Sequence, residues 1–261
     1  MTNLAKRLLT ATFGILCLIF ILFLGTRAFK ISVFLVTLEI IRELYNSFYR
    51  IGIKINIVLL FFAAFITFIF SYFNYSILYP LLLTFIVNGM LSIILINYSI
   101  KDMVYTLFSY FYGIFFITLL SCVNEISILI SAFIIAFSTD TFAYFIGSSI
   151  GKHKLIERIS PHKSVEGAIG GTIASVIITC LYFYLIKKYY INLDIKLSVV
   201  ILIFFASIAG QFGDLFASKI KRETGIKDFS QILPGHGGFL DRFDSLIFVS
   251  PFVYILYFII S

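Results

Sequence analysis

Residues 197–217 read LSVVILIFFASIAGQFGDLFA, and Asp214 is the only charged residue in this run. A helix of about 20 apolar residues is long enough to cross a hydrocarbon core of about 30 Å. The whole chain has the same character, since 61% of its 261 residues are hydrophobic and 13% are charged. Soluble domains have about 25% charged residues. The sequence therefore predicts an all-α integral membrane protein.

Further apolar segments accompany this run along the chain. Together they predict a polytopic bundle of about nine transmembrane helices, folded as a single membrane domain over residues 1–261. One segment is weaker than the others, because Glu39, Arg42 and Glu43 lie in its second half. The segments are residues 8–25, 31–48, 55–73, 77–97, 104–123, 126–146, 168–186, 197–217 and 245–261.

The basic residues are distributed unevenly between the two sides of this bundle. Nine spans place fifteen of the 20 Lys and Arg residues on the side of the N-terminus and five on the other. Cytoplasmic loops carry an excess of Lys and Arg, so we expect the N-terminus and the polar loops 147–167 and 218–244 in the cytoplasm. The formal net charge of +7 favours anionic lipid head groups and nucleotide phosphates as partners. Nucleic acid is not expected, because no soluble domain is predicted to bind it.

Four acidic residues fall within the predicted spans: Asp140, Asp214, Glu39 and Glu43. An acidic side chain in the apolar layer is costly and by default indicates a functional site. The alternative is that each side chain reaches the interface or pairs with a nearby Lys or Arg. We expect a function for Asp214 first and Asp140 second, and the alternative for the two glutamates.

The most informative stretch is residues 210–244, GQFGDLFASKIKRETGIKDFSQILPGHGGFLDRFD. It combines five Lys or Arg residues, a histidine between glycines and four aspartates. Carboxylates hold Mg²⁺ beside substrate phosphates, and basic side chains neutralise phosphate charge. Glycines let backbone N–H groups approach phosphate oxygens closely. This mixture predicts a site for a polyphosphate and a divalent metal ion, since a plain juxtamembrane loop needs only the basic residues.

Part of this stretch, Ser218 to Asp244, resembles the signature of the phosphatidate cytidylyltransferase family and shows no departure from it over 27 positions. Two shorter segments are also similar to family motifs. They are DTFAY at residues 140–144, followed by GKHK at 151–154, and SPHKSVEG at 160–167. Phe142 departs from the pattern, because many members have Gly or Ala there.

The detailed resemblance covers residues 138–250, and Glu43 also fits the family pattern. We therefore expect N-terminal spans over residues 1–130 and a catalytic part over 131–261, with the signature at 218–244. The resemblance implies that CTP and phosphatidate react to give CDP-diacylglycerol and pyrophosphate.

The resemblance also implies a Mg²⁺ cofactor, with Asp214 and Asp241 as ligands and Asp244 as a further candidate. Asp214 lies near the inner end of its span and Asp241 just before the next, so we expect the two to share one metal site. The implied catalytic residues are Asp214, Asp241, Lys221 and Arg222. The implied substrate-binding residues are Ser218, Lys219, Lys227, Asp228, His236, Gly237, Gly238, Arg242, Lys163 and Asp140.

Individual roles can be assigned within this set. Lys219, Lys221, Arg222 and Lys227 are expected to hold phosphates, and Arg242 to fix a carboxylate. His236 is expected to contact the nucleotide or shape its loop, because a phosphate that is already an anion at neutral pH needs no strong base. Ser160 is expected to cap or turn the chain rather than act as a nucleophile, and Pro161 supports a turn.

Two other functions remain open. A polyprenol kinase would transfer the γ-phosphate of CTP, and a secondary transporter would move an anionic solute. The long signature weighs against the kinase, and the gathering of acids towards one face weighs against the transporter. We expect a multi-pass protein of the cytoplasmic (inner) membrane with its active site facing the cytoplasm, and a homodimer is an open alternative.

Overall fold

The computed structural model describes residues 3–187 and 196–260. The chain divides into two compact units. The first unit comprises Met1–Cys122 and Glu223–Arg242, and the second comprises Val123–Arg222 and Phe243–Ser261. The prediction of a single membrane domain stays a prediction.

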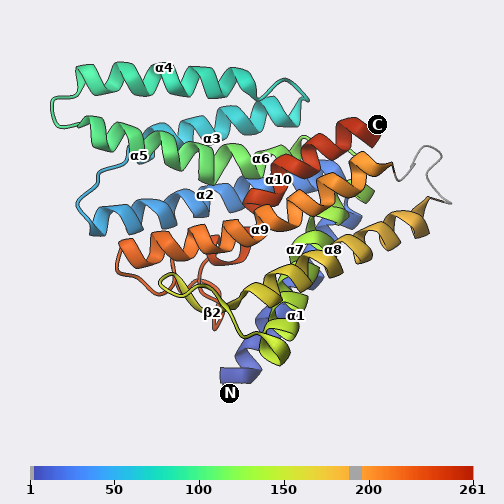
Figure 1. The fold of residues 1–261 in the computed structure, drawn as a ribbon. Helices are drawn as coiled ribbons and strands as arrows, with labels where there is room; N and C mark the ends of the chain where they lie inside the picture. Colours follow the sequence, from blue (N-terminus) through green and yellow to red (C-terminus); the bar gives the residue numbers. More distant parts are fainter. Residues whose placement is uncertain (1–2, 188–195, 261) are drawn as a thin grey trace. The chain divides into compact units, whose positions relative to one another are not determined.

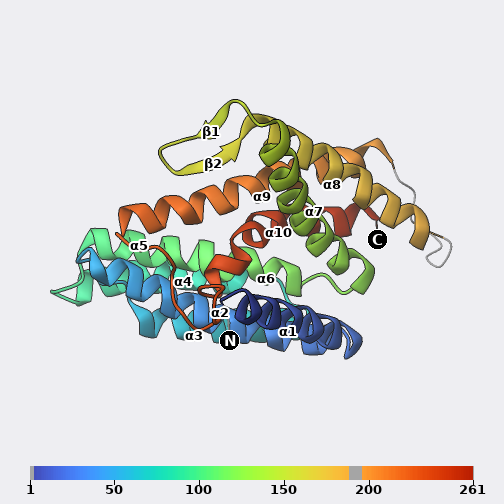
Figure 2. The same cartoon turned by 90° about the horizontal axis from the view of Figure 1, so that it is seen from below.

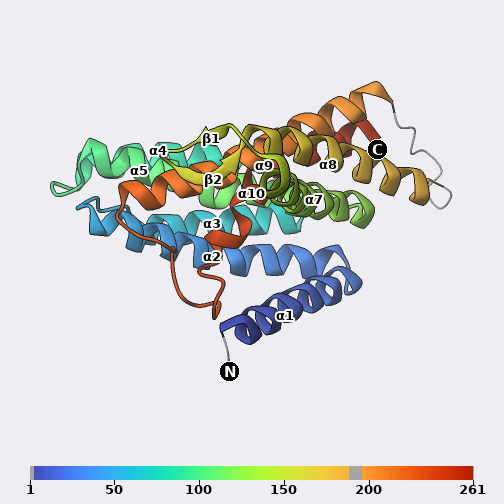
Figure 3. The same cartoon turned by 60° about the horizontal axis from the view of Figure 1, so that its bottom comes forward.

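The first unit is built from helices that follow one another with short connections (Figure 1). Helix α2 packs on α3, and α3, α4 and α5 lie side by side. Helix α1 turns back beside α2 (Figure 3). The elements are α1 (Asn3–Phe23), α2 (Thr26–Arg50), α3 (Ile57–Tyr72), α4 (Leu78–Ile94), α5 (Ile100–Tyr110), the π-helical turn η1 (Phe111–Phe115) and α6 (Phe116–Ser121).

Polar side chains cap two helices of this unit, α3 and α5. Asn56 caps α3 by accepting a hydrogen bond from Leu59 N at 3.0 Å. Ser99 and Asp102 form a capping box at the start of α5, each side chain accepting from the other residue's backbone N–H. Asp102 also accepts from Lys54 N at 2.7 Å, which ties the α2–α3 connection to α5. These caps satisfy N–H groups that have no partner inside the helix.

The second unit contains α7 (Ile126–Ile150), α8 (Val165–Ile186) and most of α9 (Leu197–Glu223) and α10 (Leu240–Ile260). Helices α7 and α8 cross at close range (Figure 2). A Cβ on Gly167 would lie 2.5 Å from Ala143 O, and one on Gly171 would lie 2.7 Å from Thr139 O. The glycines therefore let two apolar helices approach backbone to backbone, as small residues do in membrane bundles.

A two-stranded antiparallel hairpin precedes α8 (Figure 2). Its strands are β1 (Lys154–Ile156) and β2 (Ser160–Ser164). The turn expected at Ser160 and Pro161 is wrong, because both lie in β2 and the chain turns at residues 157–159. Proline is tolerated in such an edge strand where its backbone nitrogen faces away from the partner strand.

Five helices of the described residues are long and apolar enough to cross a membrane. They span Ile100–Ser121, Ile126–Ile150, Val165–Ile186, Leu197–Glu223 and Leu240–Ile260. Shorter apolar helices cover Leu9–Phe23, Ile57–Tyr72 and Leu78–Ile94. The chain is thus an all-α membrane protein apart from the small hairpin. Each predicted apolar segment falls on a helix in the described part of the chain, but the count of about nine spans stays a prediction.

Candidate functional site

The signature loop, residues 224–239, joins α9 to α10 and belongs to the first unit. Gly225 follows the end of α9 with φ of 69°, the left-handed conformation that commonly ends a helix. Within the loop the backbone doubles back, because Leu233 N donates to Gly237 O at 3.0 Å and His236 N donates to Leu233 O at 2.9 Å. The signature glycines around His236 therefore form a tight turn, in which Gly235 and Gly237 also have positive φ.

Asp241, a predicted metal ligand, stands at the start of α10 and is 8% exposed. Its Oδ2 accepts hydrogen bonds from Phe229 N at 2.9 Å and Gly238 N at 3.0 Å. Both donors are backbone groups of the signature loop. The carboxylate therefore joins an inner part of the loop to its C-terminal end, a role that sequence reasoning did not predict.

Glu43 of α2 is a second carboxylate on this loop, and it was missing from the predicted site residues. It is 1% exposed and accepts from Ser230 Oγ at 2.6 Å, Phe239 N at 2.9 Å and Leu240 N at 2.7 Å. Of the two alternatives expected for the glutamates, interface or ion pair, Glu43 forms no ion pair among residues 3–187 and 196–260, whereas Glu39 pairs with Arg42 at 3.4 Å. A buried acid in an apolar segment was the signal for Glu43.

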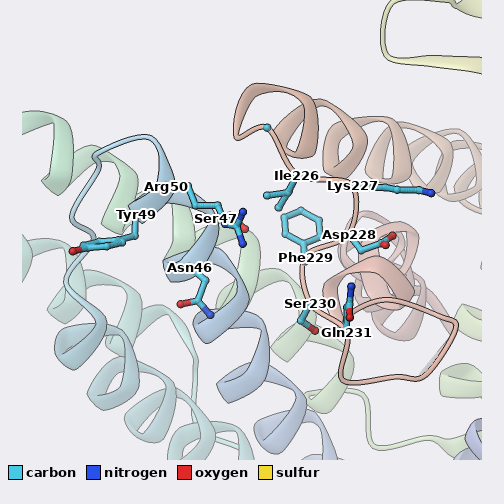
Figure 4. Close-up of a pocket in the computed structure, with 11 residues that line it drawn as sticks. Asn46, Ser47, Tyr49, Arg50, Ile226, Lys227, Asp228, Phe229, Ser230 and Gln231 are labelled. Atoms are coloured by element: carbon cyan, nitrogen blue, oxygen red, sulfur yellow. The ribbon is translucent and has the colours of Figure 1, made fainter.

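A cavity of about 720 Å³ lies in the first unit between the C-terminal turn of α2 and the signature loop (Figure 4). Two predicted substrate-binding residues, Lys227 and Asp228, line it. From α2, the Arg50 side chain points across the gap towards Ile226 and Phe229. Arg50 was not predicted, and it makes no ion pair within the described part of the chain. The remaining lining residues are Asn46, Ser47, Tyr49, Gly225, Ser230 and Gln231.

In the second unit, three of the predicted acidic residues come together from α7, α9 and α10. Buried Asp244 interacts electrostatically with Asp214, Asp140 and Lys221. Asp214 forms an ion pair with Lys163 of β2. The Oγ of Ser245 lies 3.4 Å from Asp140 Oδ2, within hydrogen-bonding distance. The hairpin thus brings a basic side chain to the carboxylates.

The residues of this cluster suit a divalent cation. Three carboxylates face two lysines, and close carboxylates repel one another unless a cation or a proton intervenes. No group of three or more His, Cys, Asp and Glu side chains is gathered tightly enough to hold a metal unaided in the described ranges. Mg²⁺ usually takes only one or two carboxylates, with water and substrate phosphates as its other ligands. The donor set is therefore compatible with Mg²⁺ bound together with a phosphate substrate.

The remaining predicted residues are divided between the units. The second unit contains Ser218, Lys219, Lys221 and Arg222 at the end of α9, and Ser218 Oγ lies 3.5 Å from Asp214 Oδ1. The first unit contains Lys227, Asp228, His236, Gly237, Gly238, Asp241 and Arg242. Asp214 and Asp241 belong to different units, so their shared metal site stays a prediction. The Nδ1 of His236 is buried and has no hydrogen-bond partner among the described residues.

Comparison with known proteins supports the resemblance read from the signature. Over 125 residues the chain is 49% identical to a phosphatidate cytidylyltransferase of Staphylococcus haemolyticus, covering 48% of this chain and 46% of the relative. The protein of that name from Staphylococcus aureus strain COL is 43% identical over 162 residues, 61% of each chain. The one from Bacillus subtilis is 47% identical over 126 residues, 48% of this chain and 45% of the relative.

The matched part thus spans between about half and three fifths of the length of these curated relatives. The model of the family described as the cytidylyltransferase family matches a longer part of the chain, residues 5–260. With a match of that extent, the chain belongs to the cytidylyltransferase family.

Proposed function

We propose that the chain is a phosphatidate cytidylyltransferase, which converts CTP and phosphatidate to CDP-diacylglycerol and pyrophosphate for phospholipid synthesis. Family membership and the name of the relatives support this activity. The observation that carries it is the cluster of Asp140, Asp214 and Asp244 with Lys163 and Lys221 in an apolar helical unit. Such a cluster suits the phosphates of a nucleotide and a lipid that meet at a membrane.

The chemistry places two anions in contact. A phosphate oxygen of phosphatidate attacks the α-phosphorus of CTP and forms a new P–O bond. The bond from that phosphorus to the β-phosphate oxygen breaks, and pyrophosphate leaves with the electron pair. Catalysis of this step depends mainly on positioning and on neutralising charge. Lys219, Lys221 and Arg222 on the last turns of α9 are suited to this, and Lys163 can exchange Asp214 for a phosphate oxygen.

Asp214 and Asp244 are the residues we propose to hold Mg²⁺, with Asp241 as a further ligand. A bound Mg²⁺ ion would supply positive charge to the phosphates and polarise the reacting phosphoryl group. The chain's own part is to hold the carboxylates of Asp214 within α9 and of Asp244 near the start of α10. Asp140 adds negative charge from α7 without being required as a ligand.

The cavity beside α2 is proposed to take part of an anionic substrate. Its volume of about 720 Å³ lies in the range of small-molecule sites, about 300–1,000 Å³. Arg50 and Lys227 outnumber Asp228 among its ionised lining residues. Arginine forms paired hydrogen bonds with phosphate oxygens, so Arg50 is suited to this contact.

We also propose that the protein lies in the cytoplasmic membrane with about nine spans and with residues 147–167 and 218–244 in the cytoplasm. Single cysteines introduced into each segment, in a background without native cysteines, would be labelled with an impermeant reagent in right-side-out and inverted vesicles. Labelling of both segments only in inverted vesicles is expected. Labelling of the two segments from opposite sides of the membrane would overturn the proposal that they share one active site. Cross-linking of the same variants tests for a homodimer.

The activity is tested with protein purified in detergent and supplied with phosphatidate, Mg²⁺ and CTP labelled at either the α- or the γ-phosphate. Label from the α-position is expected in the lipid product, with pyrophosphate released in equal amount. Transfer of γ-label to a lipid acceptor would indicate a kinase instead. Asp214→Asn, purified in the same way, is the inactive control. Absence of lipid product from active-site-intact protein would overturn the proposal.

A further inference from the structure

Glu43 and the signature loop are far apart in sequence but joined in the first unit. Ser230, Phe239 and Leu240, which donate hydrogen bonds to Glu43, lie 187, 196 and 197 residues further along the chain. Both oxygens are used, because Ser230 and Phe239 donate to Oε1 and Leu240 donates to Oε2. A side chain that is 1% exposed and engaged on both oxygens has no surface left for a substrate.

The contacts resemble a helix cap supplied from another helix. The first N–H groups of a helix have no partner within it and are usually satisfied by Ser, Thr, Asp or Asn at the preceding position. The residue before α10 is Phe239, which has no side-chain oxygen. Glu43 accepts from the N–H groups of Phe239 and Leu240 instead, and its negative charge suits the positive end of the helix dipole.

Gly238 is the residue that makes this approach possible. A Cβ at this position would lie 2.7 Å from Glu43 Cδ and 2.8 Å from Oε2. Any side chain would therefore displace the carboxylate. The N–H of Gly238 in turn donates to Asp241 Oδ2 at 3.0 Å. Asp241 thus accepts a hydrogen bond from Gly238 N, and Glu43 accepts one from the next residue, Phe239 N.

We propose that Glu43 is a positioning residue that fixes the signature loop, and with it Asp241 and the wall of the cavity at Phe229 and Ser230. This inference rests on the proposed cytidylyltransferase function for its effect on turnover, but the loop contacts stand independently of the activity. Glu43 acts through Asp241 and the loop rather than by touching either substrate.

The test compares Glu43→Gln and Glu43→Asp with wild-type protein. Glutamine keeps the shape of the side chain but replaces one accepting oxygen with an NH₂ group. That group cannot accept a hydrogen bond from Ser230, Phe239 or Leu240. Loss of one hydrogen bond to a charged group corresponds to roughly a 10- to 150-fold effect, and we expect kcat to fall by that factor in Glu43→Gln. The KM values for CTP and phosphatidate should change less than about threefold. Glu43→Asp keeps the charge and should recover part of kcat.

A matched control lies one helical turn away. Glu39 is on the same helix, pairs with Arg42 and has no hydrogen bond to the signature loop within the described part of the chain, so Glu39→Gln should leave kcat and both KM values unchanged. Hydrogen exchange supplies a readout that does not depend on activity. The amides of residues 229 and 238–240 should exchange faster in Glu43→Gln, whereas those of the Asn56-capped α3 should not. If Glu43→Gln does not fold, Ser230→Ala removes one donor and should show a smaller change of the same kind.

Two results would overturn the proposal. One is a tenfold rise in the KM of either substrate with unchanged kcat, which would indicate a substrate contact. The other is unchanged exchange of the loop amides in a folded Glu43→Gln protein. Failure of the proposed function looks different, because wild-type protein would then make no CDP-diacylglycerol while the exchange difference at the loop would remain.

Discussion

Replacing Gly238 with alanine should disable the signature loop while leaving the helices intact. The new Cβ would stand 2.7 Å from Glu43 Cδ, so the carboxylate has to move away from the loop. At least two of its three hydrogen bonds, to Ser230, Phe239 and Leu240, would then be lost. Each is worth about 1.5–3 kcal/mol because the acceptor is charged, so the loop is destabilised by about 3–6 kcal/mol.

The lower bound of this range corresponds to a factor of about 150 in the equilibrium constant between the ordered and the displaced loop. Turnover of α-labelled CTP by detergent-purified Gly238→Ala should therefore fall at least about 100-fold. Gly89→Ala is the matched control, because a Cβ on Gly89 in α4 meets no atom within 4 Å, and it should keep wild-type turnover.

A compensating change sharpens this test. In the double variant Gly238→Ala, Glu43→Asp the carboxylate is withdrawn by one methylene, which makes room for the new methyl group. The double variant should be more active than Gly238→Ala alone. The reasoning is refuted if Gly238→Ala keeps more than about a third of wild-type turnover, or if shortening Glu43 makes it worse.

Asp214→Asn and Asp241→Asn should each remove most turnover, and the double variant should be little worse than either single, since ligands of one metal act as a unit; multiplicative losses in a Mg²⁺-titrated assay would contradict a shared site. Lys221→Ala and Arg222→Ala should each lower kcat/KM by roughly 10- to 150-fold while the protein still inserts, because each removes a charge-assisted phosphate contact worth about 1.5–3 kcal/mol. Unchanged kinetics in both would show that these residues only anchor the membrane orientation. Arg50→Ala should raise the KM of CTP or phosphatidate with little change in kcat, and the KM of Arg50→Lys should lie between those of Arg50→Ala and wild type. Separate titration of CTP and phosphatidate identifies which substrate binds in the cavity.

The apolar segments and the family signature could be recognised from the sequence because both are local. A span is recognised from about 20 consecutive side chains, and each predicted segment falls on a helix in the described part of the chain. The hairpin was harder to predict, because its strands are short and contain Pro161, a residue that usually argues for a turn. Its position between α7 and α8 is what brings Lys163 to Asp214.

The sequence by itself determined the membrane class and the family, and it led to predictions for most of the residues proposed to bind phosphate and metal. Only the tertiary structure decided which of them share a neighbourhood: Asp140, Asp214 and Asp244 in one unit, and Glu43 with the signature loop in the other. Hydropathy and motif spacing depend on neighbours along the chain, whereas the contacts of Glu43 join residues nearly 200 positions apart. An ionised glutamate in an apolar segment must accept hydrogen bonds if it is buried. Only the packing of the first unit shows that the donors include the N–H groups at the start of α10.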